Sequence, residues 1–187
     1  MNYELPESIK VGRVDQPIMW DYRPILDILT VLDDKDLNER DRVLTALYIF
    51  YPCMEDIPIE DMQEAVQKLF WFVNGGNDDQ AKKAPKLMDW EQDFPFIVAP
   101  INRVLGEDIR KGNTDTHPVH WWTVLSAYYE IGDCTFAQII RIRDLKARGK
   151  KMEKQDREWY NKNRELVDFK RKYTENEKDL LSAWTCK

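Results

Sequence analysis

The sequence predicts an all-α protein, a single helical domain of about seven helices with a basic C-terminal helical arm. Apolar residues recur at helical spacing along most of the 187 residues. The chain has only seven Gly, and its β-branched residues are scattered, which argues against a turn-rich β sandwich. An apolar share of 43% with 12% aromatic residues is sufficient for a core. We therefore expect helices throughout, apart from a short hairpin around Ile9–Val14.

The N-terminal half of the sequence shows three amphipathic segments. Each has apolar residues at i, i+3, i+4 and i+7, the spacing that places them on one face of a helix. Pro24 is tolerable in the opening turn of the first segment, Pro52 stops the second, and Gly75 follows the end of the third. We expect these helices at roughly residues 19–32, 43–51 and 58–73. The apolar stripe of the first begins at Tyr22, and that of the third consists of Ile59, Met62, Val66, Leu69, Phe70 and Val73.

The middle of the chain begins with a loop and continues with two further helices. Residues 74–86 mix Gly, Asn, Asp, Lys and Pro without periodicity, which predicts a loop. A helical stretch follows from Trp90 to Leu105, where Pro100 predicts a kink or a two-part helix because it removes a backbone donor. The next helix begins near Pro118 and has the densest aromatic content, so it is either central in the core or covered by a partner.

The C-terminal part of the chain is basic. Residues 141–172 contain 13 Lys or Arg and 6 acids, a net charge of +7, whereas the rest of the chain carries −13. The apolar stripe in this part is sparse, which predicts a solvent-exposed helix that docks on another surface. We therefore divide the chain into a helical core domain, residues 1–148, and a charged helical extension, residues 149–187.

The composition also limits the location and the chemistry of the protein. No apolar run approaches the roughly 18 residues of a membrane span, and the N-terminus has no signal-peptide core, so we expect a cytoplasmic protein with no membrane contact. Three widely separated cysteines indicate reduced thiols. His117 and His120 lack the spacing of a metal site, and capping or packing is the better interpretation. Without a Walker loop, GxGxxG, GxSxG or a convergent carboxylate pair, we expect no cofactor and no enzymatic activity.

Two strings of the sequence resemble a known family. DFPFIVAPINRVLGEDIR precedes HWWTVLSAYYEIGDCTFAQIIRIRDLKARGKKM. The residues that carry the resemblance are Asp93, Ile97, Arg103, Gly106, Asp108, Ile109, Arg110, His120, Trp121, Trp122, Ile140, Arg141, Arg143, Asp144 and Lys146. Over roughly residues 15–175 the chain resembles the bacteriophage Gp15 family of tailed phages and prophages of Gram-positive bacteria. The resemblance implies a tail assembly chaperone, which coats the tape measure protein during assembly and is absent from the mature virion.

The expected partner is the tape measure protein, a long helical protein whose apolar stripes would aggregate before the tail tube covers them. Self-association between the acidic body and the basic arm is a second expected contact. The expected partner-binding residues are Trp121, Trp122, Tyr128, Arg141, Arg143 and Lys146. They border a predicted groove between the helices of Trp121–Ile131 and Phe136–Arg148, where apolar side chains lie beside positive charge. The alternative is a phage-encoded nucleic-acid-binding or DNA-metabolism accessory protein that uses the basic arm, which the total charge of −6 disfavours.

Overall fold

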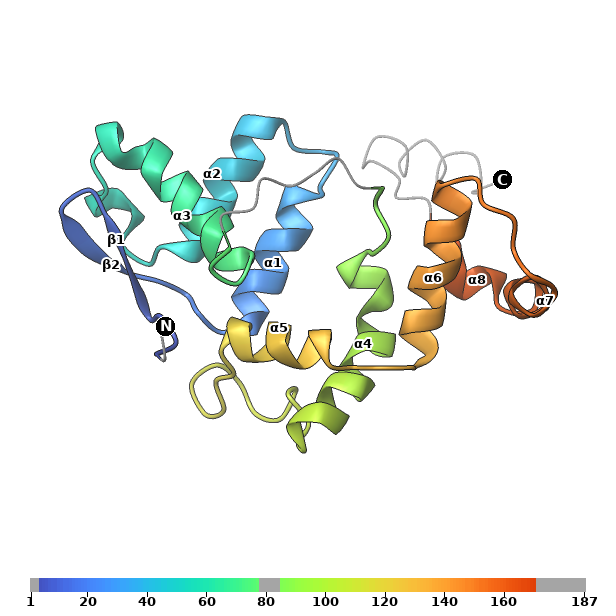
Figure 1. Ribbon diagram of the computed structural model, residues 1–187. Helices are drawn as coiled ribbons and strands as arrows, with labels where there is room; N and C mark the ends of the chain where they lie inside the picture. Colours follow the sequence, from blue (N-terminus) through green and yellow to red (C-terminus); the bar gives the residue numbers. More distant parts are fainter. Residues whose placement is uncertain (1–3, 78–84, 171–187) are drawn as a thin grey trace, which may run out of the picture.

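The computed structural model describes residues 4–77 and 85–170, and the all-α prediction is confirmed for them. This part of the chain contains eight α-helices, two short 3-10 helices and one two-stranded antiparallel sheet. The hairpin, α2 and α3 lie at one end of the molecule, α1, α4 and α5 in the middle, and α6, α7 and α8 at the other end (Figure 1).

The N-terminal hairpin lies where the sequence predicts it. Strand β1, Ser8–Val11, pairs with β2, Val14–Pro17, and both Ile9 and Val11 are buried. Gly12 forms the turn with a φ of +59°, a conformation that costs a residue with a Cβ about 1–2 kcal/mol. Its N–H donates to Glu64 Oε2 at 2.9 Å, so the tip of the hairpin is fastened to α3.

The three predicted N-terminal helices are all present, but each begins a few residues before or after the predicted position. They are α1, Tyr22–Leu32; α2, Glu39–Phe50; and α3, Met62–Val73; the 3-10 turns η1, Met54–Asp56, and η2, Ile59–Asp61, connect the last two. Asp21 and Asn38 cap the first two helices, each by accepting a backbone N–H. The prediction that α2 begins at residue 43 is wrong, because its first turn is polar and adds nothing to the apolar stripe.

Two helices cross the middle of the molecule. They are α4, Trp90–Leu105, and α5, Trp121–Tyr129. Helix α4 is continuous through Pro100, so the two-part alternative is wrong; the fully buried Ile97 and Ile101 on its inner face offset the lost hydrogen bond. Helix α5 begins three residues after Pro118, because His120 is extended and its side chain forms the cap.

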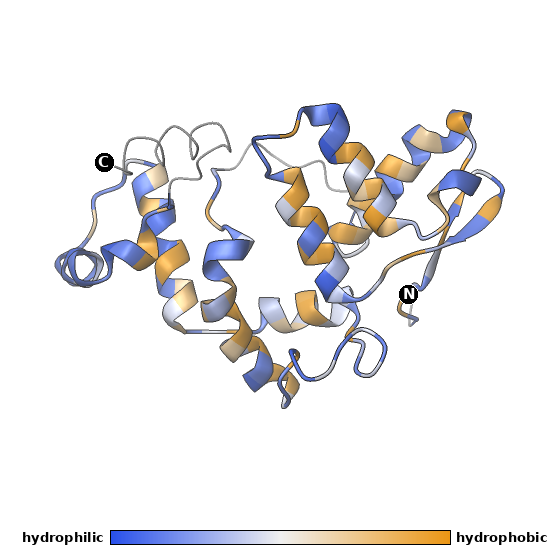
Figure 2. Ribbon diagram, turned by 180° about the vertical axis from the view of Figure 1, so that it is seen from behind, coloured by the Kyte–Doolittle hydropathy of each residue, from blue (hydrophilic) through white to orange (hydrophobic). Residues whose placement is uncertain are grey.

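The C-terminal helices pack on their own chain. They are α6, Thr135–Ala147; α7, Lys154–Lys162; and α8, Arg164–Val167. Ile139, Ile142 and Val167 form a small buried cluster, separate from the main core of the hairpin and α1–α5. The predicted exposed helix that docks on another surface corresponds to α7 and α8, because most of residues 154–167 are exposed. The surface on which they dock is α6 of the same chain, against which α8 buries Val167. The outer surface of α7 is hydrophilic (Figure 2).

Candidate interaction site

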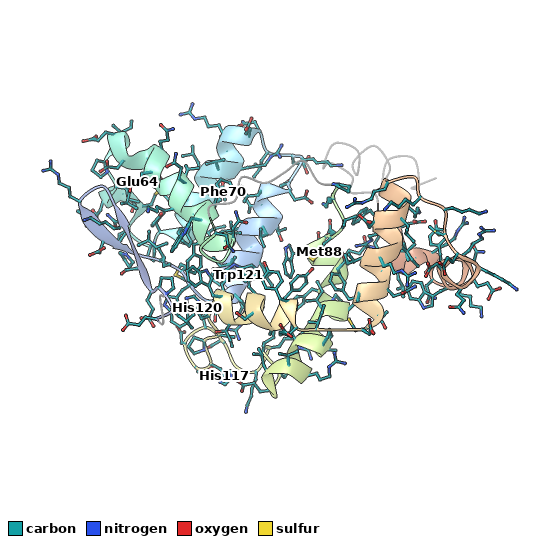
Figure 3. All side chains as sticks on the ribbon, in the orientation of Figure 1. Glu64, Phe70, Met88, His117, His120 and Trp121 are labelled. Atoms are coloured by element: carbon teal, nitrogen blue, oxygen red, sulfur yellow. The ribbon has the colours of Figure 1, made fainter. Side chains whose placement is uncertain are left out.

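The three aromatic residues of the predicted site lie in or against the main core. Trp121 is 1% exposed, and its Nε1–H donates to the carbonyl of Val73 at 2.9 Å (Figure 3). Trp122 is partly buried and donates in the same way to the carbonyl of Phe72 at 2.8 Å. Tyr128 is partly buried beside α4. The two tryptophans therefore join α5 to the end of α3, and Trp121 is not available to a partner in this structure.

The three predicted cations lie on α6 and are all paired within the chain. Arg143 is buried, Arg141 bonds to Asp156 at 2.9 Å, and Lys146 bonds to Asp168. Asp156 is buried in the first turn of α7, so its bond to Arg141 fastens α7 to α6. The six predicted residues therefore do not form one surface: the tryptophans face α3, and the cations face α4, α7 and the end of α8.

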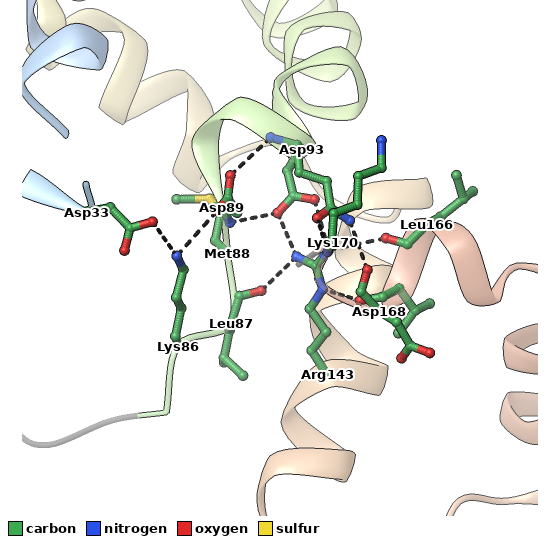
Figure 4. Close-up of polar contacts among 12 residues, drawn as sticks. Asp33, Lys86, Leu87, Met88, Asp89, Asp93, Arg143, Leu166, Asp168 and Lys170 are labelled. Atoms are coloured by element: carbon green, nitrogen blue, oxygen red, sulfur yellow. Dashed lines mark hydrogen bonds and ion pairs between the residues drawn. The ribbon is translucent and has the colours of Figure 1, made fainter. Parts of the chain in front are cut away.

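Arg143 is the centre of a buried polar clamp (Figure 4). Its Nη1 and Nη2 donate to the two carboxylate oxygens of Asp93 at 2.6 and 3.0 Å. The remaining donors reach three main-chain carbonyls: Nε to Val167 at 2.6 Å, Nη1 to Leu87 at 3.0 Å and Nη2 to Leu166 at 3.1 Å. All five guanidinium hydrogens are thereby used. The clamp holds together α4, α6, the end of α8 and the segment before α4.

Two further contacts complete this clamp. The ring of Phe169 lies with its centroid 4.1 Å from the guanidinium carbon of Arg143, in a cation–π arrangement. Asp93 also accepts the N–H of Asp89 at 2.9 Å, while Asp89 caps α4. The sequence places Asp93 and Arg143 in the family strings, but nothing in their spacing of 50 residues indicates that they pair.

A second polar cluster joins α1 to the segment before α5. Asp21 accepts the N–H of Val119 at 2.7 Å, and Arg23 Nη2 donates to the carbonyl of Ile109 at 3.1 Å. His120 Nδ1 accepts the N–H of Trp122 at 3.0 Å, so its Nε2 carries the proton and donates to Pro6 O at 3.0 Å. Burial lowers the pKa of His120 below its ordinary value. The predicted capping role of this histidine is confirmed.

The buried polar groups of residues 4–77 and 85–170 are satisfied. No buried side-chain nitrogen or oxygen in these ranges lacks a hydrogen-bond partner. The same ranges contain no group of three His, Cys, Asp or Glu residues placed to hold a metal ion. No helix there is long and apolar enough to cross a membrane.

An apolar groove lies on the surface between α2 and α3. Its volume is about 800 Å³, and its lining residues are Asn38, Glu39, Arg40, Val43, Leu44, Leu47, Ile59, Met62, Gln63 and Val66. Leu47 is buried at the floor, whereas Leu44 is 36% exposed and Ile59 is 86% exposed. The sequence did not identify this groove, because Ile59 and Met62 continue the apolar stripe of α3 and are predicted to face the core.

The basic region has fewer available charges than its composition suggests. Five of its cations are in ion pairs, namely Arg141 with Asp156, Arg143 with Asp93, Lys146 with Asp168, Arg148 with Asp144 and Lys154 with Glu158. A cation already bonded to a carboxylate gains less from a phosphate, because the existing pair must first be broken. This pairing makes the nucleic-acid alternative weaker.

The fold and its contacts define a small helical protein with two polar clusters that tie distant segments together and an open apolar groove. The family described as Bacteriophage Gp15 protein matches residues 1–169, so the chain belongs to this family. The matched range includes the hairpin, the groove and the clamp around Arg143. No curated protein and no solved structure matches the chain.

Proposed function

We propose that this bacteriophage protein is a tail assembly chaperone that binds the tape measure protein during tail morphogenesis. It acts by binding and without catalysis, in the cytoplasm of the infected or lysogenic host cell, and it is absent from the mature virion. The observation that carries the proposal is the apolar groove between α2 and α3, since an uncovered apolar surface is typical of a protein that binds another.

The groove suits a helical partner. Helix α2 has 12 residues and is therefore about 18 Å long, which accommodates three turns of a partner helix. Ile59 and Leu44 expose apolar surface there, and burying such a side chain contributes about 1.5–3 kcal/mol. One groove of this kind binds weakly, but several copies along one long partner increase the total affinity through multivalency.

Self-association would support such a coat. Residues 141–172 carry a net charge of +7 and the rest of the chain −13, so copies attract one another head to tail. Although several cations are paired internally, Arg157 and Lys162 on α7 remain exposed. We expect light scattering at low salt to show species larger than 22.3 kDa that shrink as salt is added.

Co-expression tests the proposed function directly. A fragment of the tape measure protein from the same phage genome is produced under three conditions. It is expressed alone, together with this chain, and together with an unrelated helical protein of similar size as the control. The proposal requires that only this chain keeps the fragment soluble and that the complex survives gel filtration. Equal precipitation in all three cases, or this chain among the proteins of purified virions, would contradict it. Retention on a nucleic-acid column that is lost steeply with salt would favour the alternative.

A further inference from the structure

We infer that the groove between α2 and α3 binds an amphipathic helix whose apolar stripe is flanked by Lys and Arg. This inference rests on the proposed function and adds to it the binding surface and the chemistry of the partner segment.

The shape of the groove favours a side-chain ridge over a small molecule. Ile59 is 86% exposed at one edge, so the groove is open to solvent and cannot enclose a ligand. Its apolar lining comes from consecutive turns of two helices, Val43 and Leu44 on α2 and Met62 and Val66 on α3. An amphipathic helix places apolar residues at i, i+3, i+4 and i+7, and such a ridge fits between two helices.

The charge around the groove selects a basic partner. Residues 38–73, which contain both of its helices, have seven Asp or Glu and three Lys or Arg, a net charge of −4. The exposed lining residues Glu39 and Arg40 have opposite charges, and the exposed Glu60, which follows Ile59 directly, leaves this edge of the groove acidic. Lys and Arg beside the apolar stripe of the partner would therefore face carboxylates, which increases the association rate and selects against acidic helices.

Two surfaces of a second copy fit the groove poorly. A second groove has the same net charge of −4 around it, so two grooves placed face to face repel each other. The basic helix α7 has the required charge, but its exposed positions are polar, and Trp159 and Tyr160 are partly buried on its other side. A separate protein segment that combines apolar and basic residues is therefore the occupant.

The test uses two designed helical peptides of about 18 residues with the same leucine stripe, flanked by Lys in one and by Glu in the other. Binding to the full chain is measured by fluorescence anisotropy for wild type, Ile59→Ser and the control Val14→Ser. Val14 is also an exposed β-branched residue, on the hairpin. We expect Ile59→Ser to weaken binding of the Lys peptide about tenfold, and the control to leave it unchanged. The Glu peptide should bind wild type about tenfold more weakly than the Lys peptide.

Methyl NMR with the Lys peptide locates the site independently. Shifts confined to the methyl groups of Leu44, Ile59 and Val66 support the inference. Equal binding of the two peptides, or an Ile59→Ser variant that binds like wild type, overturns it. So does a wild-type dimer that Ile59→Ser dissociates, since a second copy would then be the occupant. Nuclear Overhauser contacts between Ile59 and Trp184 in the free protein would assign the groove to this chain's own C-terminus and also overturn it.

Peptides from the tape measure protein separate this inference from the proposed function. If they bind wild type and Ile59→Ser equally well, the chaperone proposal stands and the groove assignment falls. If none of them binds while the Lys peptide occupies the groove, the assignment stands and the chaperone proposal falls.

Discussion

Replacing Arg143 with methionine tests the largest buried polar interaction of the structure. The substitution keeps an unbranched apolar side chain but removes all five donors, so Asp93, which is fully buried, loses its cation. Leaving one partner of a buried ion pair alone costs about 3–5 kcal/mol. For a chain of this size, about 2–4 °C is lost per kcal/mol, so we expect the melting temperature to fall by about 6–20 °C.

The assay is thermal unfolding followed by circular dichroism, with two companion variants. Arg148→Met is the matched control, because Arg148 is 56% exposed and its pair with Asp144 contributes only about 0.3–0.5 kcal/mol. The double variant Arg143→Met with Asp93→Leu removes both charges, and it should recover much of the lost stability. An Arg143→Met variant that melts within about 2 °C of wild type, or a double variant that is less stable than Arg143→Met alone, would refute the reasoning.

Three further predictions concern other parts of the fold. Burial lowers the pKa of His120 in the folded state, so its contribution to stability is present above about pH 6.5 and is lost as the pH falls below it. His120→Asn keeps a capping acceptor, and its unfolding free energy should change less between pH 8 and pH 5 than that of wild type. Trp121→Ala should cost about 3–5 kcal/mol in urea unfolding, whereas Tyr129→Ala, at a residue 70% exposed, should cost less than about 0.5 kcal/mol; equal losses would contradict the core assignment. Gly12→Ala should destabilise more than Gly149→Ala, because both have positive φ but only Gly12 is crowded, with a side chain 2.3 Å from the added Cβ; equal melting temperatures would exclude this crowding effect.

The helical class and most helix positions could be predicted from the sequence, because the period of apolar residues is a local property. The stripe from Tyr22 onward and the glycines after α3 indicated helices that the structure contains. Polar first turns add nothing to that period, so the start of α2 at Glu39 was missed. The hairpin and the capping role of His120 could also be predicted, since both depend on neighbours in the chain.

The family, too, follows from the order of residues along the chain, and the match to residues 1–169 confirms it. The roles of its characteristic residues do not follow from that order. The sequence predicts that Arg143 is an exposed cation on a basic helix. In the fold, Arg143 is bonded to Asp93 and to three main-chain carbonyls. Ion pairing between residues 50 positions apart depends on how α4 and α6 pack, which no local pattern encodes.

The groove between α2 and α3 could not be predicted from the sequence, because it depends on the tertiary structure alone. Ile59 and Leu69 belong to the same apolar stripe in the sequence, yet Leu69 is 1% exposed and Ile59 is 86% exposed. Periodicity identifies the face of a helix that avoids water, but it does not say whether the protein's own core is long enough to cover that face. At Leu69 the core covers the stripe, whereas Ile59, in the 3-10 turn η2 before α3, is left open to solvent.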